Sequence, residues 1–210
     1  PVDTTRNKRW KPKRQYFADG VYLFDPGKMR FKLSASWFNE LLESKGAMQP
    51  PYGTWALASY FTTNRLNVRG EVNKAWDTQR FLDVLIAWSY YDRRKNTYYK
   101  DLTNLERNLT SNPGDHDTTM IYNYLLRTTY SRNRESINLN YQAGIDMNYE
   151  TGRGKRIDGE EQGIGDFAGF LSVKWQPLGG LLIQPGLRAI YNTKYKAPLV
   201  YSLNVKWDPI

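Results

Sequence analysis

The sequence of 210 residues contains no cysteine and only one histidine. Without cysteine the chain can form no disulfide, no thiolate metal site and no thiol nucleophile. A transition-metal site built from clustered histidines is not expected either, because His116 has no second histidine to join it. We therefore expect His116 to be an exposed loop residue rather than a metal or haem ligand.

Long hydrophobic runs are also missing. No stretch approaches the roughly 18 apolar residues that a membrane-spanning helix requires, and the mean hydropathy is -0.71. The sequence is therefore not that of a helical membrane protein. A membrane β-barrel stays possible, because every second residue of a barrel strand is polar.

Aromatic residues are abundant, with 16 Tyr, 7 Trp and 8 Phe. Such residues form belts at both edges of the apolar band of a membrane barrel, although a soluble domain would bury some of them. The net charge is +9, which raises the question of nucleic acid. The basic residues are mostly dispersed, with their densest group in residues 6–14, so no nucleic-acid partner is expected.

Apolar and polar residues alternate with a period of two along most of the chain. Residues 137–150 are the clearest case, with Ile137, Ile145 and Tyr149 on one face and Asn138, Glu150 and their neighbours on the other. This stretch exceeds the usual globular strand of about 5–6 residues. The pattern predicts nine strands, at residues 15–24, 28–42, 55–73, 78–97, 117–131, 136–150, 166–176, 181–194 and 197–207.

The predicted connections alternate between short and long. Short turns are expected at residues 25–27, 74–77, 132–135 and 177–180, and long polar loops at residues 43–54, 98–116 and 151–165. Membrane barrels combine short periplasmic turns with longer extracellular loops in this way. On this orientation Tyr149 lies near the outer interface, and Trp175 and Trp207 lie near the inner one. The fold class is therefore predicted as all-β, an antiparallel transmembrane β-barrel segment of about nine long strands.

An odd number of strands is unusual, because bacterial single-chain barrels close with an even number. An open sheet edge in lipid leaves backbone groups unpaired at several kcal/mol each. We therefore expect residues 1–210 to form part of a larger barrel. In it, further strands would pair with the two edge strands at residues 15–24 and 197–207.

Residues 183–207 read IQPGLRAIYNTKYKAPLVYSLNVKW. This stretch resembles a barrel segment of TonB-dependent outer-membrane receptors, particularly those of Bacteroidetes, and YFTTNR at residues 60–65 and the aromatic-basic end of residues 88–99 look similar to the same receptors. The residues that match are Pro185, Gly186, Arg188, Tyr191, Asn192, Pro198, Ser202, Leu203 and Asn204.

The resemblance implies a non-enzymatic receptor in the bacterial outer membrane that takes up a scarce nutrient, namely an iron chelate, haem, a cobalamin or a glycan. Such receptors hold a plug inside a barrel of about 22 strands. We find no plug-like region or TonB box in this chain. The implied partners are outer-membrane lipid and lipopolysaccharide, the remaining barrel and plug of the receptor, the TonB complex acting through that plug, and the ligand.

The polar faces of the strands supply the candidate ligand path through the lumen. The residues expected there are Arg127, Asn140, Gln142, Asp146, Arg188 and Asn204. The residues expected to contact lipid include Ile145, Leu203 and Val205. The polar-face carboxylates Asp83, Asp146 and Glu150 could serve acid-base chemistry. Without a nucleophile or a companion histidine, we expect them instead to pair with Lys32, Arg127 and Arg188.

Three alternatives stay open at this stage. Asp158, Glu160 and Glu161 form an acidic loop that could hold Ca²⁺, but their spacing is not that of an EF-hand, and we expect a solvated loop without metal or cofactor. The chain could also be a self-standing structural or adhesion barrel of ten strands. A soluble carbohydrate-binding β-domain is the third alternative.

Overall fold

The computed structural model describes residue 6, residues 10–133 and residues 138–208. These residues form a single antiparallel sheet and one short 3-10 turn, η2 (Pro113–Asp115). No helix in the described part of the chain is long and apolar enough to cross a membrane. The strands are β1 (Lys13–Phe24), β2 (Met29–Met48), β3 (Trp55–Ala75), β4 (Arg80–Asp101), β5 (Arg107–Leu109), β6 (Asp117–Arg132), β7 (Leu139–Gly154), β8 (Glu161–Leu178), β9 (Leu181–Asn192) and β10 (Val200–Trp207).

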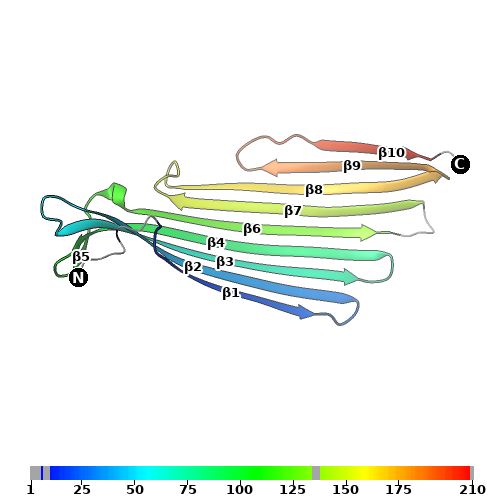
Figure 1. The fold of residues 1–210 in the computed structure, drawn as a ribbon. Coiled ribbons are helices and arrows are strands. Elements are labelled where there is room, and N and C mark those ends of the chain that lie inside the picture. The colour runs from blue at the N-terminus through cyan, green and yellow to red at the C-terminus, as the bar shows by residue number, and fades with distance from the viewer. Residues whose placement is uncertain (1–5, 7–9, 134–137, 209–210) are drawn as a thin grey trace.

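The sheet is a meander in which each long strand pairs with the next one in sequence (Figure 1). Its order is β1-β2-β3-β4-β6-β7-β8-β9-β10, and β5 pairs with the end of β4. The prediction of an all-β antiparallel fold with nine long strands is therefore confirmed. The short β5 was missed because its three residues, Arg107–Leu109, lie within the expected loop at 98–116. Ile137, which was placed on the apolar face, lies outside the described residues.

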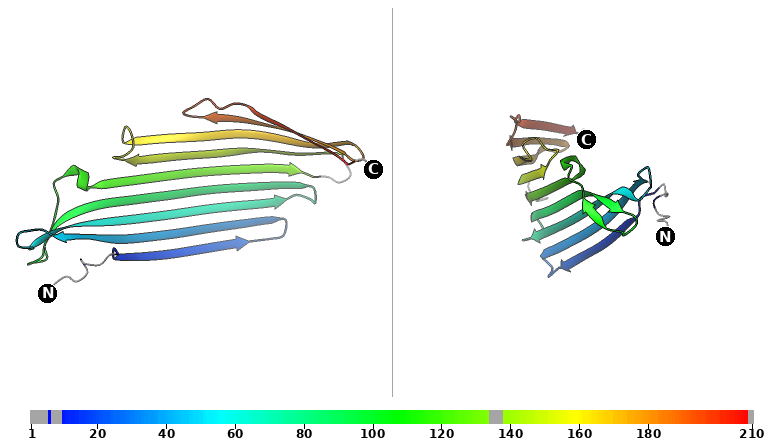
Figure 2. Two further views of the ribbon diagram at one scale, coloured as in Figure 1. Left: turned by 45° about the horizontal axis from the view of Figure 1, so that its top comes forward. Right: turned by 90° about the vertical axis from the view of Figure 1, so that its left-hand side faces the viewer.

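Several strands run further than the alternation predicted. β2 continues to Met48, β7 continues to Gly154 and β8 begins at Glu161. The predicted long loops at 43–54 and 151–165 are therefore wrong in extent, because strand pairing leaves only short connections there. A ladder satisfies backbone N–H and C=O groups whatever the side chains are, so polar hairpins can extend into water. At the end of the sheet where these connections lie, hairpin β2–β3 and the β4–β5 segment extend beyond β7, β8 and β9 (Figure 2).

The two edge strands, β1 and β10, lie at opposite margins of the sheet and do not pair with each other (Figures 1 and 2). Ten strands of this chain therefore do not close into a barrel, as a self-standing barrel would require. Each edge presents a row of backbone donors and acceptors without a partner strand among the described residues.

The sheet is a single layer with almost no core. The only buried apolar side chains in the described part of the chain are Ala56, Ala58 and Ala168. Leu203, Ile86 and Trp207, in contrast, are 66%, 57% and 73% exposed. A soluble β-sandwich buries such residues between two sheets, and the described residues provide no second sheet.

Residues opposite each other in a ladder share a face, so the register divides the side chains into two faces. One face, hereafter the apolar face, carries Leu82, Ile86 and Tyr90 on β4, opposite Tyr130, Leu126 and Tyr122 on β6. The stretch 82–90 matches the about 9–11 residues with which a barrel strand spans a bilayer. The other face, hereafter the polar face, carries the charged residues of the same stretch, Asp83 on β4 and Arg127 on β6. Ile145, Leu203 and Val205 lie on the apolar face, where we expected them.

Aromatic side chains border the apolar face at both ends. At the end with the short turns, Trp76 contacts Tyr130 at 5.9 Å between ring centroids, and Tyr130 contacts Tyr141 at 6.1 Å. At the opposite end, where the longer connections lie, Tyr90 contacts Tyr122 at 5.1 Å. We call these the short-turn end and the long-loop end. Polar residues follow directly beyond the second border, where Asn39, Asn64 and Asp92 continue the apolar-face rows.

Aspartates organise two of the turns at the short-turn end. Asp77 accepts hydrogen bonds from the backbone N–H groups of Gln79 and Arg80, at 2.9 and 2.8 Å, and from Arg80 Nε at 2.8 Å. These bonds, led by that from Gln79, hold the pKa of Asp77 below its usual value. Asp25 accepts from Arg30 and from the Gly27 backbone, which likewise lower its pKa.

Candidate functional site

The centre of the polar face holds an ionic cluster of three predicted site residues. The Oδ2 atom of Asp146 on β7 forms two ion pairs. It lies 3.0 Å from Arg127 Nη2 on β6 and 3.2 Å from Arg188 Nη2 on β9. The guanidinium-bearing side chains are 54% and 39% exposed, whereas that of Asp146 is 16% exposed. The expected pairing of Asp146 with both arginines is thus confirmed. The cluster therefore presents two partly exposed guanidinium groups, one on each side of the Asp146 carboxylate that binds both.

Lys32, Asp83 and Glu150 do not join this cluster. Lys32 Nζ lies 3.9 Å from Glu71, which also receives Arg69 Nε at 2.8 Å. Asp83 accepts a hydrogen bond from Asn73 at 2.6 Å, and Glu150 lies opposite Asn123 in the ladder. Lys32 therefore pairs with Glu71 and not with one of the three predicted carboxylates, and the expected pairing of Asp83 and Glu150 with Lys32, Arg127 or Arg188 is wrong for the residues that the structure describes.

Asn140 and Gln142 line a hollow of about 310 Å³ near the short-turn end of the polar face. Asn204 on β10 lies opposite Gln184, which lines the same hollow and donates to the Ser172 hydroxyl at 3.2 Å. The six predicted residues therefore share the polar face but divide into this region and the ionic cluster. Side chains that also line the hollow include Phe81, Ser131, Arg132, Asn133, Tyr141 and Lys174.

A second hollow of about 310 Å³, at the long-loop end of the polar face, was not predicted as a site. Its basic residues come from β4 and from the β7–β8 connection, and its aromatic residues from β3 and β4. We call this the basic-aromatic cluster, and its lining residues are Phe61, Tyr91, Arg93, Lys95, Asp117, Thr119 and Arg156.

Cations in and beside the basic-aromatic cluster are held against rings. The guanidinium carbon of Arg93 lies 5.3 Å from the Phe61 ring centroid, and that of Arg65 lies 5.2 Å from the Tyr91 ring. Arg156 Nε lies 2.9 Å from Asp117 Oδ2. Asp117 Oδ1 is buried and has no hydrogen-bond partner among the described residues. The cluster thus combines guanidinium donors, aromatic faces and one unsatisfied acceptor, which suits a partly anionic ligand that also carries a donor group.

The sequence contained part of the signal for this cluster, since the aromatic-basic end of residues 88–99 includes Tyr91, Arg93 and Lys95. Phe61 and Arg156 are far away in sequence. Only the register and the β7–β8 connection bring them to the same place, so alternation within one strand was not sufficient.

His116 differs from its expected role as an exposed loop residue. Its Nε2 lies 2.8 Å from the Thr110 carbonyl oxygen, and its backbone carbonyl accepts Lys155 Nζ at 3.2 Å. The side chain is part-buried because the β5 and η2 segment folds back onto β4. In the described residues no group of three or more His, Cys, Asp or Glu side chains could hold a metal ion, and this includes the acidic residues 158–161.

The motif at the end of the chain has local structural roles. Asn192 is buried, donates to Asp166 at 2.6 Å, and accepts from the backbone N–H groups of Lys194 and Tyr195. Gly186 lies opposite Ser202, and a Cβ at Gly186 would come within 2.6 Å of that hydroxyl. These residues shape the β9–β10 hairpin.

No protein-family model matches the chain, and no curated protein matches it. Solved structures share part of its sheet. The unliganded ferric citrate transporter FecA is 13% identical over 84% of this chain and 27% of its own, with a TM-score of 0.43. The outer membrane transporter YddB from Escherichia coli is 9% identical over 93% of this chain and 36% of its own, with a TM-score of 0.48. BauA, the ferric preacinetobactin receptor from Acinetobacter baumannii, is 10% identical over 92% of this chain and 36% of its own, with a TM-score of 0.48.

The chain therefore spans well under half the length of these three proteins. At such identities the likeness concerns the antiparallel sheet alone.

Proposed function

We propose that this chain is a barrel segment of an outer-membrane receptor that imports a scarce nutrient in a TonB-dependent manner. The observation that carries the proposal is the apolar face. It is about as tall as a bilayer core, is bordered by rings such as Trp76 and Tyr90 at its two ends, and belongs to a sheet in which, among the described residues, alanines are the only buried apolar side chains. Such a surface needs lipid on one side and water on the other.

Further strands of the same receptor would complete the sheet on both sides. The edge backbones of β1 and β10 require hydrogen-bond partners in a membrane, where each unpaired group costs several kcal/mol. Residues 1–210 are then one part of a barrel whose lumen holds a plug, and the TonB complex acts through that plug. The Bacteroidetes assignment depends on the motif of residues 185–204 and stays a prediction.

The polar face would line the ligand path. In this proposal the basic-aromatic cluster lies at the extracellular rim and makes the first contact with the ligand. Arg93, Lys95 and Arg156 favour an anionic ligand such as an iron chelate or haem over a neutral glycan. Further along the path, Arg127 and Arg188 offer two more guanidinium groups, followed by Asn140, Gln142 and Asn204. Asp146, which lies between these two arginines, then holds their guanidinium groups in place and does not catalyse a reaction.

Binding to outer-membrane vesicles from cells that make the complete receptor tests this proposal. The probes are ferric citrate, haem, cobalamin and maltohexaose, and the variant is R93A/R156A. We expect the anionic probe that binds to lose about tenfold or more in affinity, because two charge-assisted contacts are removed.

The matched control is K194A/K196A, which removes two exposed cations from the β9–β10 connection at the same end of the sheet. It should bind like the wild type. Equal binding by R93A/R156A and the wild type, or binding of the neutral glycan alone, would contradict the proposed ligand path.

A further inference from the structure

One row of residues on the polar face is mostly aromatic or apolar, and we call it the aromatic row. The register joins its members across five strands from β1 to β6, in the order Phe17, Phe38, Arg65, Tyr91 and Ile121. Tyr91 also lines the basic-aromatic cluster. The aromatic row therefore borders that hollow on the side that faces the short-turn end.

The rings at the β1 margin of the aromatic row are open to solvent. Phe17 is 68% exposed, although its ring centroid lies 5.0 Å from that of Phe38. The next row toward the short-turn end is polar in contrast, with Asp19 opposite Ser36. Large apolar side chains that are exposed together on an otherwise polar surface mark a binding site. The aromatic row is therefore a candidate binding surface.

Arg65 lies in the middle of the aromatic row, between two rings. Its guanidinium carbon is 5.9 Å from the ring centroid of Phe38 and 5.2 Å from that of Tyr91. Among the described residues no carboxylate forms an ion pair with Arg65, whereas Arg69 on the same face of β3 pairs with Glu71 at 2.8 Å. The two rings thus hold the guanidinium of Arg65 while its N–H donors stay available to a ligand.

Arg93 repeats this arrangement one ladder step away. Its guanidinium carbon lies 5.3 Å from the ring centroid of Phe61, and no described carboxylate pairs with it. Because Arg65 lies opposite Tyr91, two residues before Arg93, the two arginines are diagonal neighbours on the polar face. Such neighbours lie about 7–8 Å apart. Each arginine can therefore bind a different carboxylate of the same ligand through two parallel hydrogen bonds.

The aromatic row also sets the size of the ligand. From Arg65 to Phe17 the row crosses two strand spacings, which together measure about 10 Å. A single six-membered ring does not cover this width, whereas a system of several joined rings does. Flat conjugated rings pack well against both phenyl rings and guanidinium planes.

We infer that this part of the polar face binds a flat, conjugated multi-ring ligand that carries two carboxylates on one edge, as a porphyrin does. Arg65 and Arg93 bind one carboxylate each, and the ring system extends over Phe38 to Phe17. The inference rests on the proposed ligand path and adds the chemical class of the ligand. A neutral sugar would leave both guanidinium groups without a counter-charge, and an aliphatic polycarboxylate would leave the rings uncovered.

Fluorescence titration of the complete receptor in detergent micelles tests the inference, with empty micelles as the blank. The probe is metal-free protoporphyrin IX, which has the ring system and both carboxylates. Its dimethyl ester lacks the charges, and suberate, added as a competitor, lacks the rings. We expect R65A and F17A/F38A each to bind protoporphyrin IX about tenfold more weakly than the wild type, because charge-assisted bonds or ring contacts are lost.

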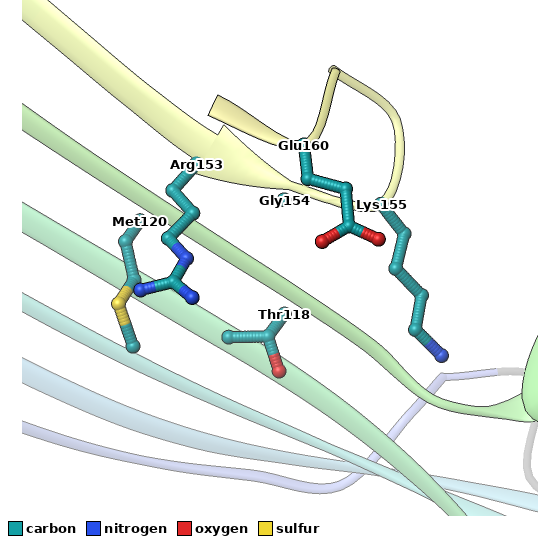
Figure 3. Close-up of a pocket in the computed structure, with 6 residues that line it drawn as sticks. All are labelled: Thr118, Met120, Arg153, Gly154, Lys155 and Glu160. Atoms are coloured by element: carbon teal, nitrogen blue, oxygen red, sulfur yellow. The ribbon is translucent and has the colours of Figure 1, made fainter. Parts of the chain in front are cut away.

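The matched control is R153A. Arg153 is also an exposed arginine at the long-loop end, but it lies opposite Met120 on the apolar face. Figure 3 shows both residues at a separate hollow of about 410 Å³. Removing the Arg153 side chain should leave the binding of protoporphyrin IX unchanged, because a ligand on the polar face does not reach it.

The wild type should bind the dimethyl ester at least tenfold more weakly than protoporphyrin IX, and suberate should not displace the porphyrin. The inference is overturned if protoporphyrin IX does not bind, if the ester binds equally well, if suberate displaces the porphyrin, if F17A/F38A binds like the wild type, or if R153A loses as much affinity as R65A. In each of these cases, a receptor whose binding of ferric citrate still depends on Arg93 and Arg156 keeps its proposed ligand path. A complete receptor that binds none of the anionic probes would overturn both proposals.

Discussion

Arg188 of β9 reaches across the whole width of β8 to Asp146 of β7, with 3.2 Å between Nη2 and Oδ2. The residue of β8 directly opposite Asp146 is Ala168, which is buried. A small side chain at this position leaves the space through which the ion pair passes. Arg127 reaches the same oxygen from the other side, so three strands share one carboxylate.

Enlarging Ala168 should therefore break the pairing between Arg188 and Asp146. In a double-mutant cycle with D146N and R188Q, we expect a coupling free energy of about 0.5–1 kcal/mol, typical of a partly exposed pair. In an Ala168→Leu background the coupling should fall close to zero. Urea unfolding of the receptor in lipid vesicles measures it. Ala189→Leu adds the same bulk on the apolar face, and a loss of coupling there as well would argue against a role for Ala168.

Arginine should be costly on one face of β10 and mild on the other. Leu203→Arg places a charge on the apolar face and should destabilise the protein by roughly 2–4 kcal/mol if it lies near the bilayer midplane. Asn204→Arg places the same charge on the polar face and should change the free energy of unfolding by less than about 0.5 kcal/mol. Unfolding from vesicles compares the two variants, and equal costs would refute the assignment of faces.

Gly144 accommodates a close approach between strands. A Cβ at this position would collide with the Thr128 carbonyl oxygen and would lie 2.6 Å from the Phe170 ring. Gly144→Ala should therefore lower the free energy of unfolding by about 1–3 kcal/mol. Gly169→Ala is the control, because nothing lies within 4 Å of the added carbon there. A control variant as unstable as Gly144→Ala would show that packing around Gly144 is not the cause.

The turn at Asp77 should depend on pH. Because its folded-state pKa is lowered, the carboxylate contributes stability above its unfolded pKa of about 3.9, and this contribution is lost as the pH falls through the folded value. The difference in unfolding free energy between the wild type and Asp77→Asn should therefore be present at pH 7 and shrink at pH 3. A difference that is constant over this range would show that the charge of Asp77 does not matter.

The sequence determined the faces better than the ends of the strands. Alternation of residues such as Ile145 and Asp146 predicted which side chains share a face, because the period of two is a property of each strand alone. It did not predict that β2 would continue to Met48, since a ladder outside lipid tolerates polar residues on both faces. The basic-aromatic cluster was missed because Phe61 and Arg156 meet only through the pairing register, which depends on all the intervening strands.

The central claim is that lipid covers one face of the sheet and water the other, and a cysteine scan along β7 tests it most directly. The chain has no cysteine, so each of residues 139–149 except Gly144, where a side chain would collide with Thr128 and Phe170, can be replaced in turn and labelled with an environment-sensitive fluorophore in reconstituted vesicles. We predict that nitroxide-labelled lipid quenches the probe at Tyr141, Ala143, Ile145 and Met147, and that an aqueous quencher acts at Asn140, Gln142, Asp146 and Asn148. Quenching without this period of two, or with the two sets exchanged, would contradict the account.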